Sequence, residues 1–449
     1  MNANNRKFSL ELRVRNTTLF YFLYIVLIYI LALCIWPRIQ TSQFTIYKYI
    51  LSENLVKTIV CFLLSTVMWI IVNNRYSENS TFSGRVILLL TMLYFVPGLA
   101  ICSALNTDWG YIFSFVIYYF TIVIADCLIK YPRRPFKAIT FKQSNTIVIL
   151  LIIVCLIYPF VLTTVFNNSF SLSKILLTLN DPYGVRADAR EKSISWAFLL
   201  LEYWGVYFGA VMVTYSFRKK KYLLAIAFVL IELFYFTLQG NRIILFIVGI
   251  AIVLGFFKVS NKWLSLIFVG LLVAQILELI IFNGNETIGI VTNVFRRFSV
   301  VPNIISPKYY DYFQTATPDY LRGHFPSISA LFGTKSEYDF DIGYIIGQQN
   351  FGMYLNANTG LVGGAIFEFG NLGVIIDPIM LVVSLRVFEK VLFYTDNENI
   401  MTVSLIYSSL AANSWAIWSQ LFRISYMPLF VLSLYFLFNR IEPTTEIEH

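Results

Sequence analysis

The residues most able to do chemistry lie in one long polar segment, 283–358, set late in a chain that is otherwise mostly apolar. Arg322-Gly-His324 places a fixed positive charge beside the only histidine other than the last residue of the chain. Histidine can act as a base near neutral pH, and a guanidinium stays charged and pairs well with phosphate. His324 is therefore a candidate catalytic base, with an ordinary polar loop residue as the alternative.

An acidic pair follows in the same segment. Asp339-Phe-Asp341 has the Asp-x-Asp spacing with which many enzymes hold a divalent cation through carboxylate oxygens. Two carboxylates at this spacing are common, and the neighbours Glu337 and Tyr338 favour an acidic loop tip over a cavity. We therefore expect no metal site in this protein.

Other arginines could bind an anion. Guanidinium forks suit phosphate oxygens and stay charged, so arginines at the membrane surface form a candidate clamp for a phosphate group. A solvated helix start is the alternative for Arg186 and Arg190, and snorkelling of the side chain to the interface is the alternative for Arg242. The candidates are Arg186, Arg190, Arg242, Arg296 and Arg297.

The elements that must position these residues are membrane spans. The chain is 58% hydrophobic and only 13% charged, a composition typical of a polytopic membrane protein. We expect an all-α integral membrane protein with about twelve transmembrane helices. The apolar stretches are 18–36, 55–72, 86–105, 110–128, 146–166, 196–216, 222–238, 242–257, 263–282, 371–393, 401–418 and 424–439.

Orientation follows from Lys and Arg, which are retained in cytoplasmic loops. Most of the 34 basic residues fall on one side if the N-terminus is inside. With an even number of spans, we expect both termini in the cytoplasm and one large loop, 283–358, on the outer side. Regions 1–282 and 359–449 then hold about nine and about three helices. No basic face alternates with aromatic residues in a soluble module, so nucleic acid is not an expected partner.

Two further expectations concern the outer side. The segment 290–313 mixes apolar, aromatic and basic residues, as a segment lying at the membrane interface does. We expect Pro302 and Pro307 to break it into short pieces. Ionisable groups inside apolar runs tend to face a cavity or a partner, and Glu368 is such a group, close in depth to the outer loop.

Several features together resemble a known family. They are the many spans, the one large outer loop, the Gly240-Asn-Arg242 turn, and the re-entry Asn356-Ala-Asn-Thr-Gly360 followed by Phe367-Glu-Phe-Gly-Asn-Leu-Gly373. Arg322 and Gly333 also match an Arg-x10-Gly pattern of outer loops in some members, although no second copy follows Arg186 or Arg190. In architecture, nearly the whole chain resembles the oligosaccharide repeat-unit polymerases, the Wzy-type O-antigen polymerases.

The resemblance implies a GT-C-like, metal-independent membrane glycosyltransferase without a cofactor, in the inner (cytoplasmic) membrane of a bacterium with its active face in the periplasm. Such an enzyme moves a growing glycan from undecaprenyl diphosphate to a sugar hydroxyl of a new lipid-linked repeat unit, which builds O-antigen or a similar surface polysaccharide. The implied partners are the undecaprenyl-diphosphate-linked oligosaccharide, membrane lipid, a chain-length regulator protein and a flippase.

That reaction needs cations for the diphosphate, polar groups for the sugars and a base for the hydroxyl proton. Outer arginines suit the first task, with Arg322 ahead of Arg242, Arg190 and Arg186, and then Arg296 and Arg297. Amides such as Asn356 and Asn358 suit the second task. The residues eligible for the third are His324, Glu368 and Asp319.

Rival functions stay open. An O-antigen ligase has the same architecture and a similar donor. A lipid-linked oligosaccharide flippase has a similar number of spans, but it needs no long outer loop and usually places charges along a central cavity. A secondary transporter predicts two similar halves with broken helices, and the hydropathy of this chain shows no such symmetry.

Overall fold

The computed structural model of the 449-residue chain is all-helical over the residues that it describes. Apart from single residues at 47, 153, 156, 157, 160, 175 and 357, these are 16–39, 49–52, 54–76, 82–129, 196–239, 243–257, 261–282, 290–323, 336–338, 342–352 and 360–392.

Within this part of the chain, five helices are long and apolar enough to cross a membrane. An apolar helix of roughly 20 residues matches the thickness of a bilayer, and several such helices in one chain make this a multi-pass membrane protein. The five spans are Leu19–Arg38, Leu55–Tyr76, Phe82–Ala104, Trp109–Leu128 and Gly360–Arg386.

The helices begin and end close to the predicted apolar stretches. The agreement covers α3 (Leu55–Tyr76), α6 (Trp109–Leu128), α10 (Trp196–Arg218), α11 (Tyr222–Gln239), α12 (Ile243–Phe256), α13 (Asn261–Phe282) and α19 (Gly373–Leu392). The stretches predicted at 146–166, 401–418 and 424–439 lie largely or wholly outside the described residues. A total of about twelve spans therefore stays a prediction.

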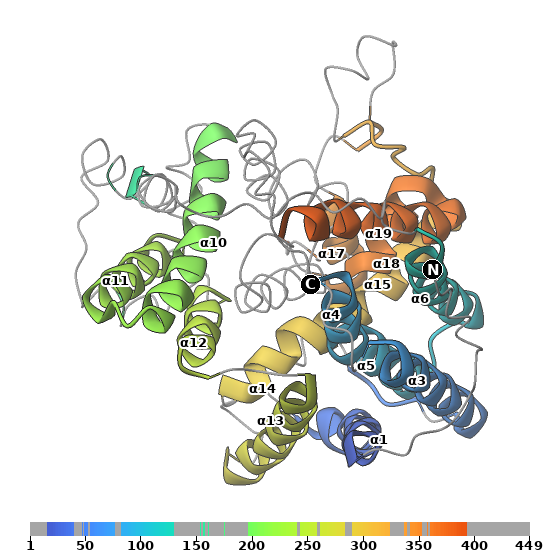
Figure 1. Ribbon diagram of the computed structural model, residues 1–449. Coiled ribbons are helices and arrows are strands. Elements are labelled where there is room, and N and C mark those ends of the chain that lie inside the picture. Colours follow the sequence, from blue (N-terminus) through green and yellow to red (C-terminus); the bar gives the residue numbers. More distant parts are fainter. Residues whose placement is uncertain are drawn as a thin grey trace, which may run out of the picture.

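The helices form two groups (Figure 1). In one group, α10, α11 and α12 pack on one another. In the other, α3 and α6 lie with α1 (Asn16–Ile30), α4 (Phe82–Leu90), α5 (Val96–Ala104) and α19, and α13 lies along α1. Gly205 and Gly209 let α10 approach α11, because a side chain there would collide with Tyr235 or Glu232. Small residues four apart allow close helix packing in a membrane.

An ion-pair cluster fixes one end of the larger group, which we call the Arg386 end. The carboxylate of Asp126 in α6 is only 3% exposed. It pairs with Arg386 of α19 at 2.7 Å and with Arg75 of α3 at 3.2 Å. One buried acid thus joins three helices.

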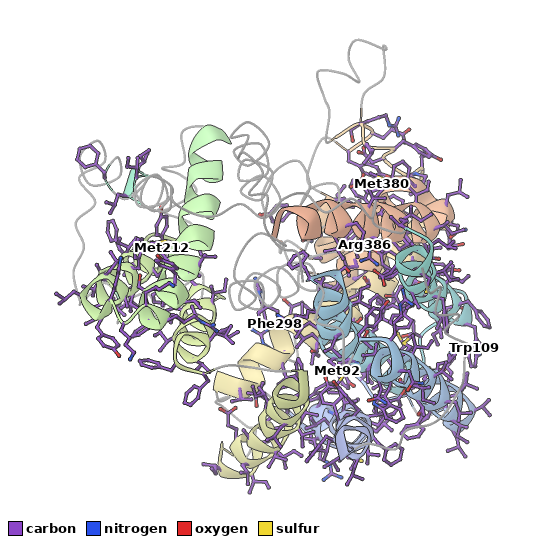
Figure 2. All side chains as sticks on the ribbon, viewed as in Figure 1. Met92, Trp109, Met212, Phe298, Met380 and Arg386 are labelled. Atoms are coloured by element: carbon purple, nitrogen blue, oxygen red, sulfur yellow. The ribbon has the colours of Figure 1, made fainter. Side chains whose placement is uncertain are left out.

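The opposite end, which we call the Trp109 end, is closed by Lys57 of α3. Its ammonium group donates to Asn106 Oδ1 at 2.7 Å and to the Thr107 carbonyl, both in the turn between α5 and α6. The same ammonium lies 5.3 Å from the ring centroid of Trp109. Trp109 and Arg386 are both labelled in Figure 2.

Three π-helical turns occur in the described residues, and each is followed by a proline two positions later. η1 (Leu31–Ile35) precedes Pro37, η3 (Thr91–Phe95) precedes Pro97, and η4 (Arg296–Val300) precedes Pro302. Proline lacks an N–H group, and its ring collides with the carbonyl four residues earlier. A π turn before the proline relieves that collision, so the helix continues through Pro97 and Pro302, whereas after Pro37 it ends in a 3-10 turn at Arg38.

The π turn at η3 leaves two carbonyls that other helices satisfy. In a π turn, the carbonyl of Met92 would accept the N–H group five residues later, and in an α-helix the carbonyl of Leu93 would accept the N–H group four residues later. Both partners would be residue 97, and Pro97 has no N–H group. The Ser299 hydroxyl donates to Leu93 O at 2.7 Å, and the Tyr24 hydroxyl donates to Met92 O. Because an unpaired buried carbonyl is costly, these bonds fix α1 and η4 against η3.

The segment 290–313 differs from the sequence prediction. We expected short interfacial pieces broken at Pro302 and Pro307. The structure instead joins α14 (Ile290–Phe295), η4 and α15 (Val301–Phe313) in one helical run, and all residues from 298 to 307 are buried. Figure 2 labels Phe298 of η4 and Met92 of η3, two π turns that pack together. The run rises roughly 36 Å, which is comparable with the apolar thickness of a bilayer.

This helical run lies parallel to η3 and α5. Asn303 donates to the Tyr94 carbonyl at 3.1 Å, and its side chain lies against Gly98. Farther along, Tyr310 packs against Tyr111 at the start of α6, with ring centroids 5.9 Å apart. The run therefore ends at the Trp109 end.

Glu278 of α13 caps the start of α14. Its carboxylate accepts the N–H groups of Val291 and Thr292 at 3.0 and 2.8 Å, and a negative charge at a helix N-terminus is favourable. The run 290–313 ends at the Trp109 end, so its start, α14, which lies about two turns before Ser299, points toward the Arg386 end. The end of α13 contacts this start and therefore also lies toward the Arg386 end. The sequence prediction placed this end of α13 on the opposite side, at the outer loop. It missed the buried run 290–313 because Arg296 and its charged neighbours lower the mean hydropathy of that segment.

The glycine-rich re-entry forms a broken helix. α18 (Gly360–Phe369) starts inside the bundle and rises beside α15, η5 (Gly370–Leu372) turns the chain, and α19 returns to the Arg386 end. Gly370 has φ +59, and a side chain at Gly373 would collide with the Ala365 carbonyl. Glycine tolerates both situations, so the chain can turn sharply between α18 and α19.

Candidate functional site

Two segments far apart in the sequence meet at the Trp109 end and form a compact polar turn. After α15 the chain folds back so that the N–H groups of Asp319 and Tyr320 donate to the carbonyls of Phe367 and Glu368 at 2.9 and 2.8 Å. Carbonyls in the last turn of a helix lack helical partners, so this turn caps α18. It brings together three of the predicted site residues, Asp319, Arg322 and Glu368.

Asp319 is fully buried and holds the turn in shape. Its Oδ2 atom accepts the Gly323 N–H at 2.7 Å, and its Oδ1 atom accepts the hydroxyl of Ser336. Both carboxylate oxygens are therefore engaged by the turn itself. This geometry suits a positioning residue better than a base in contact with substrate.

The turn is strained at two consecutive residues. Tyr320 and Leu321 have φ values of +51° and +64°, and the Arg322 N–H donates to the Asp319 carbonyl at 3.1 Å. Positive φ at both central positions is the pattern of a type I′ turn, for which Asn and Gly are preferred. For larger side chains the left-handed region costs roughly 1–2 kcal/mol per residue. Strain of this kind concentrates at functional sites.

Arg322 lies across this turn with its side chain 19% exposed. Its Nε atom donates to the Asp319 carbonyl at 2.7 Å, and Nη2 donates to the Pro318 carbonyl at 3.0 Å. The guanidinium also lies 3.5 Å from the Glu337 carboxylate and 5.9 Å from the ring centroid of Tyr320. The charge is thus held in a fixed position at the surface of the turn.

An aromatic cluster supports the turn from below. The ring centroid of Phe313 lies 5.9 Å from that of Tyr338 and 5.7 Å from that of Phe367. The Tyr338 hydroxyl donates to the Thr317 carbonyl. Burial raises the pKa of Tyr338 to about 12, so its hydroxyl stays protonated and keeps this hydrogen bond at neutral pH.

Glu368 lies in α18 at the Trp109 end and is fully buried. Its place at the outer side of the membrane stays a prediction. The backbone N–H groups of Asp319 and Tyr320 cap the end of α18, so Glu368 lies beside the turn and is closed to solvent. A buried carboxylate of this kind is expected to face a partner or a cavity.

Arg296 and Arg297 do not join this turn, which corrects the expectation that they lie in an outer loop. They belong to η4, and Arg296 is only 8% exposed. The helix between Arg296 and Phe313 rises roughly 25 Å, which separates both arginines from Arg322. The reason is the burial of the run 290–313 against η3 and α5.

The remaining predicted site residues lie outside the described residues. They are His324, Arg186, Arg190, Arg242, Asn356 and Asn358. Ala357, between the two asparagines, is described: its N–H donates to the Gly343 carbonyl at 3.0 Å, next to the start of α17 (Ile342–Phe351), and its carbonyl accepts the Tyr309 hydroxyl at 2.7 Å.

No group of three potential metal ligands forms among the residues that the structure describes. Asp339 and Asp341 are not among them. A reaction without a divalent metal therefore stays a prediction.

Two buried charges escaped the sequence analysis, Asp126 and Lys57. Arg75 and Arg386 were interpreted only as orientation signals, although both pair with Asp126. The sequence could have revealed them, because Asp126 and Lys57 are charged residues inside predicted apolar stretches. An ionisable group there needs a partner.

No protein-family model matches the chain, and neither a curated protein nor a solved structure matches it. Functional conclusions therefore depend on the turn itself. It offers a fixed guanidinium, an exposed carboxylate at Glu337 and an exposed aromatic ring at Tyr320. Such a set can hold a polar, anionic ligand at one end of a membrane bundle.

Proposed function

We propose that the protein is a membrane glycosyltransferase that polymerises lipid-linked oligosaccharide repeat units. The observation that carries this proposal is the convergence of Asp319, Arg322 and Glu368 on one strained turn at the Trp109 end. Those residues were selected from the sequence for this chemistry, and the fold brings Glu368 from a later segment to Asp319 and Arg322, which are neighbours in the sequence.

In the proposed reaction, a sugar hydroxyl of a lipid-linked repeat unit attacks the anomeric carbon of the growing glycan. The bond between that carbon and the undecaprenyl diphosphate oxygen breaks, and its electron pair leaves with the diphosphate. Arg322 stabilises the leaving charge, together with Arg186, Arg190 and Arg242. His324 or Glu368 takes the hydroxyl proton. Asp319 positions the turn that carries Arg322.

The active face is periplasmic in this proposal, and the membrane is the bacterial inner membrane. The side follows from the predicted orientation, in which the basic loops lie in the cytoplasm, and the donor stays anchored in the lipid while its glycan lies in water. A site at one end of the bundle, next to the bilayer surface, suits such a substrate. A chain-length regulator and a flippase belong to the proposal as protein partners.

The decisive experiment gives purified protein an undecaprenyl-diphosphate-linked repeat unit with one of two acceptors, a second lipid-linked repeat unit or lipid A-core. A ladder of chain lengths with the first acceptor supports the polymerase. A single transfer to lipid A-core would make the protein a ligase. Transfer to neither acceptor removes the glycosyltransferase proposal. Mass spectrometry of a deletion strain adds an independent readout, since single repeat units on an intact core favour the polymerase.

A further inference from the structure

Tyr320 is the most unusual residue of the turn. It is 55% exposed, although it is aromatic and lies directly after the fully buried Asp319. Most other exposed large apolar side chains of the described residues lie on helices, where lipid can cover them. The strained conformation at Tyr320 and Leu321 directs this ring away from the buried cluster below the turn.

Polar groups surround the ring. The Arg322 guanidinium lies over the ring, 5.9 Å from its centroid, and Tyr320 is 55% exposed, which leaves ring surface for a ligand. The Glu337 carboxylate is 56% exposed and pairs with Arg322 at 3.5 Å. Among the described residues, the ring therefore lies beside a charged donor group, and that group pairs with a charged acceptor group.

This combination fits one class of ligand. A pyranose ring has an apolar face of C–H groups and a rim of hydroxyls. An aromatic face takes up the apolar face of the sugar, while charged side chains make strong hydrogen bonds to the rim. A lipid chain has no groups that pair with Arg322 and Glu337, so the polar surroundings favour a sugar over lipid.

We propose that Tyr320 is the stacking platform of a carbohydrate subsite, with Arg322 and Glu337 as its hydrogen-bonding rim. The subsite holds one pyranose unit of a glycan at the Trp109 end of the bundle. This inference rests on the proposed function for its biological role. Its physical content is sugar binding, which can be measured without any transfer reaction.

The test is saturation-transfer NMR with the full chain in lipid nanodiscs. The probe is the free repeat-unit oligosaccharide, released by mild acid from lipid-linked precursors of the native host. Tyr320→Asn removes the ring, but Asn tolerates the left-handed conformation and keeps the turn. Tyr320→Phe keeps the ring, and Tyr222→Ala removes a tyrosine that is 49% exposed on α11.

We expect the wild type and Tyr320→Phe to transfer saturation to C–H protons of one sugar unit. Binding should weaken about tenfold in Tyr320→Asn and stay unchanged in Tyr222→Ala. Equal binding by Tyr320→Asn and the wild type overturns the subsite. The subsite is also overturned if a spin-labelled lipid broadens the Tyr320 ring more than a soluble relaxation agent does, because the ring then lies in the bilayer.

The same samples separate this inference from the proposed function. Ring-dependent sugar binding by a protein that extends no chains keeps the subsite and removes the polymerase. Chain extension by a protein whose sugar binding ignores Tyr320 keeps the polymerase and removes the subsite.

Discussion

Arg386 Nη2 lies 2.7 Å from Asp126 Oδ1, and this ion pair joins α19 to α6 across 260 residues of sequence. The Asp126 carboxylate also accepts the Tyr76 hydroxyl at 2.9 Å and pairs with Arg75 at 3.2 Å. The acid is almost fully buried, and its single negative charge is shared by two guanidiniums whose side chains are 19% and 39% exposed. The Arg386 end of the bundle therefore depends on one carboxylate.

Asp126→Asn tests that dependence. The change keeps the size of the side chain but leaves two partly exposed guanidiniums without their carboxylate, so we expect a loss of about 1–3 kcal/mol in unfolding free energy. Thermal unfolding of the purified protein in detergent measures it. The matched control is Asp311→Asn, which breaks a half-exposed pair with Lys308 at 3.7 Å and should cost less than about 1 kcal/mol. Equal losses in both variants contradict the argument.

A second prediction concerns the carbonyl that Pro97 leaves without a helical partner. Ser299→Ala removes the hydroxyl that donates to Leu93 O and should cost about 1–3 kcal/mol, because a buried acceptor stays unpaired. In a Pro97→Ala background, residue 97 has an N–H group that can serve the same carbonyl, so the cost of Ser299→Ala should fall by at least half. A double-mutant cycle in thermal unfolding measures this coupling.

The control for that cycle is Thr121→Ala. Its hydroxyl donates to the Ile117 carbonyl four residues earlier in the same helix, at an exposed position. Its cost should be small and should not change with Pro97. If Ser299→Ala costs the same with and without Pro97, the proline does not create the need for the hydroxyl.

The sequence predicted the helices well, and the reason is physical. Apolar stretches such as 110–128 must be helical in lipid, where every backbone group needs an internal partner, and α6 (Trp109–Leu128) confirms the boundary. The buried run 290–313 was not recognised as a membrane-length helix, because Arg296, Arg297 and Lys308 make it less apolar. Hydropathy reports contact with lipid, whereas this run is covered by other helices.

The site was predictable in its residue types but not in its geometry. Asp319 and Glu368 were selected as polar residues near the outer side, and the structure brings them together through two backbone hydrogen bonds, from Asp319 to Phe367 and from Tyr320 to Glu368. No sequence pattern announces the type I′ turn, since Tyr320 and Leu321 are residues that such turns disfavour. Local propensity was overruled there by the buried contacts of Asp319.

That conflict gives a third prediction. At residue 321, φ is +64°, so the stability ranking should be Gly at least equal to Leu, and Val lowest. Gly loses roughly 0.5–1 kcal/mol of entropy but escapes a left-handed strain of similar or larger size, whereas a β-branched side chain increases that strain. Thermal unfolding of Leu321→Gly and Leu321→Val gives the ranking.

Gly352 provides the matched reference, because it has φ +68 and no neighbouring atom within reach of an added methyl group. Gly352→Ala should therefore cost about 1 kcal/mol from the backbone alone. If Leu321→Val is as stable as Leu321→Gly, the turn is not strained in solution.

A fourth prediction separates the two roles of Arg322. Arg322→Gln keeps a donor for the Pro318 and Asp319 carbonyls but removes the charge, so chain extension should fall by at least about a hundredfold with little change in unfolding temperature. Arg322→Lys should restore part of the rate, because a point charge lacks the bidentate fork. Asp311→Asn, which only breaks the half-exposed pair with Lys308 on α15, should stay within a few-fold of the wild type.

The outcome that contradicts this role is an active but less stable Arg322→Gln protein. Arg322 would then serve only to hold the turn, and the diphosphate clamp would have to come from Arg186, Arg190 or Arg242. Chain length and thermal unfolding measured on the same preparations distinguish the two cases.

The last prediction is that transfer does not need a divalent metal. The first predicted outer loop, 37–54, carries Glu53 as its only acidic residue, whereas metal-dependent lipid-sugar transferases of this membrane class usually present an acidic pair there. Arginines then neutralise the diphosphate as a cation does elsewhere. Purified protein should extend chains in excess EDTA, and Asp339→Asn combined with Asp341→Asn should keep most of the rate. If chelation stops the reaction and magnesium or manganese restores it, the mechanism uses a metal and that acidic pair becomes the leading ligand site.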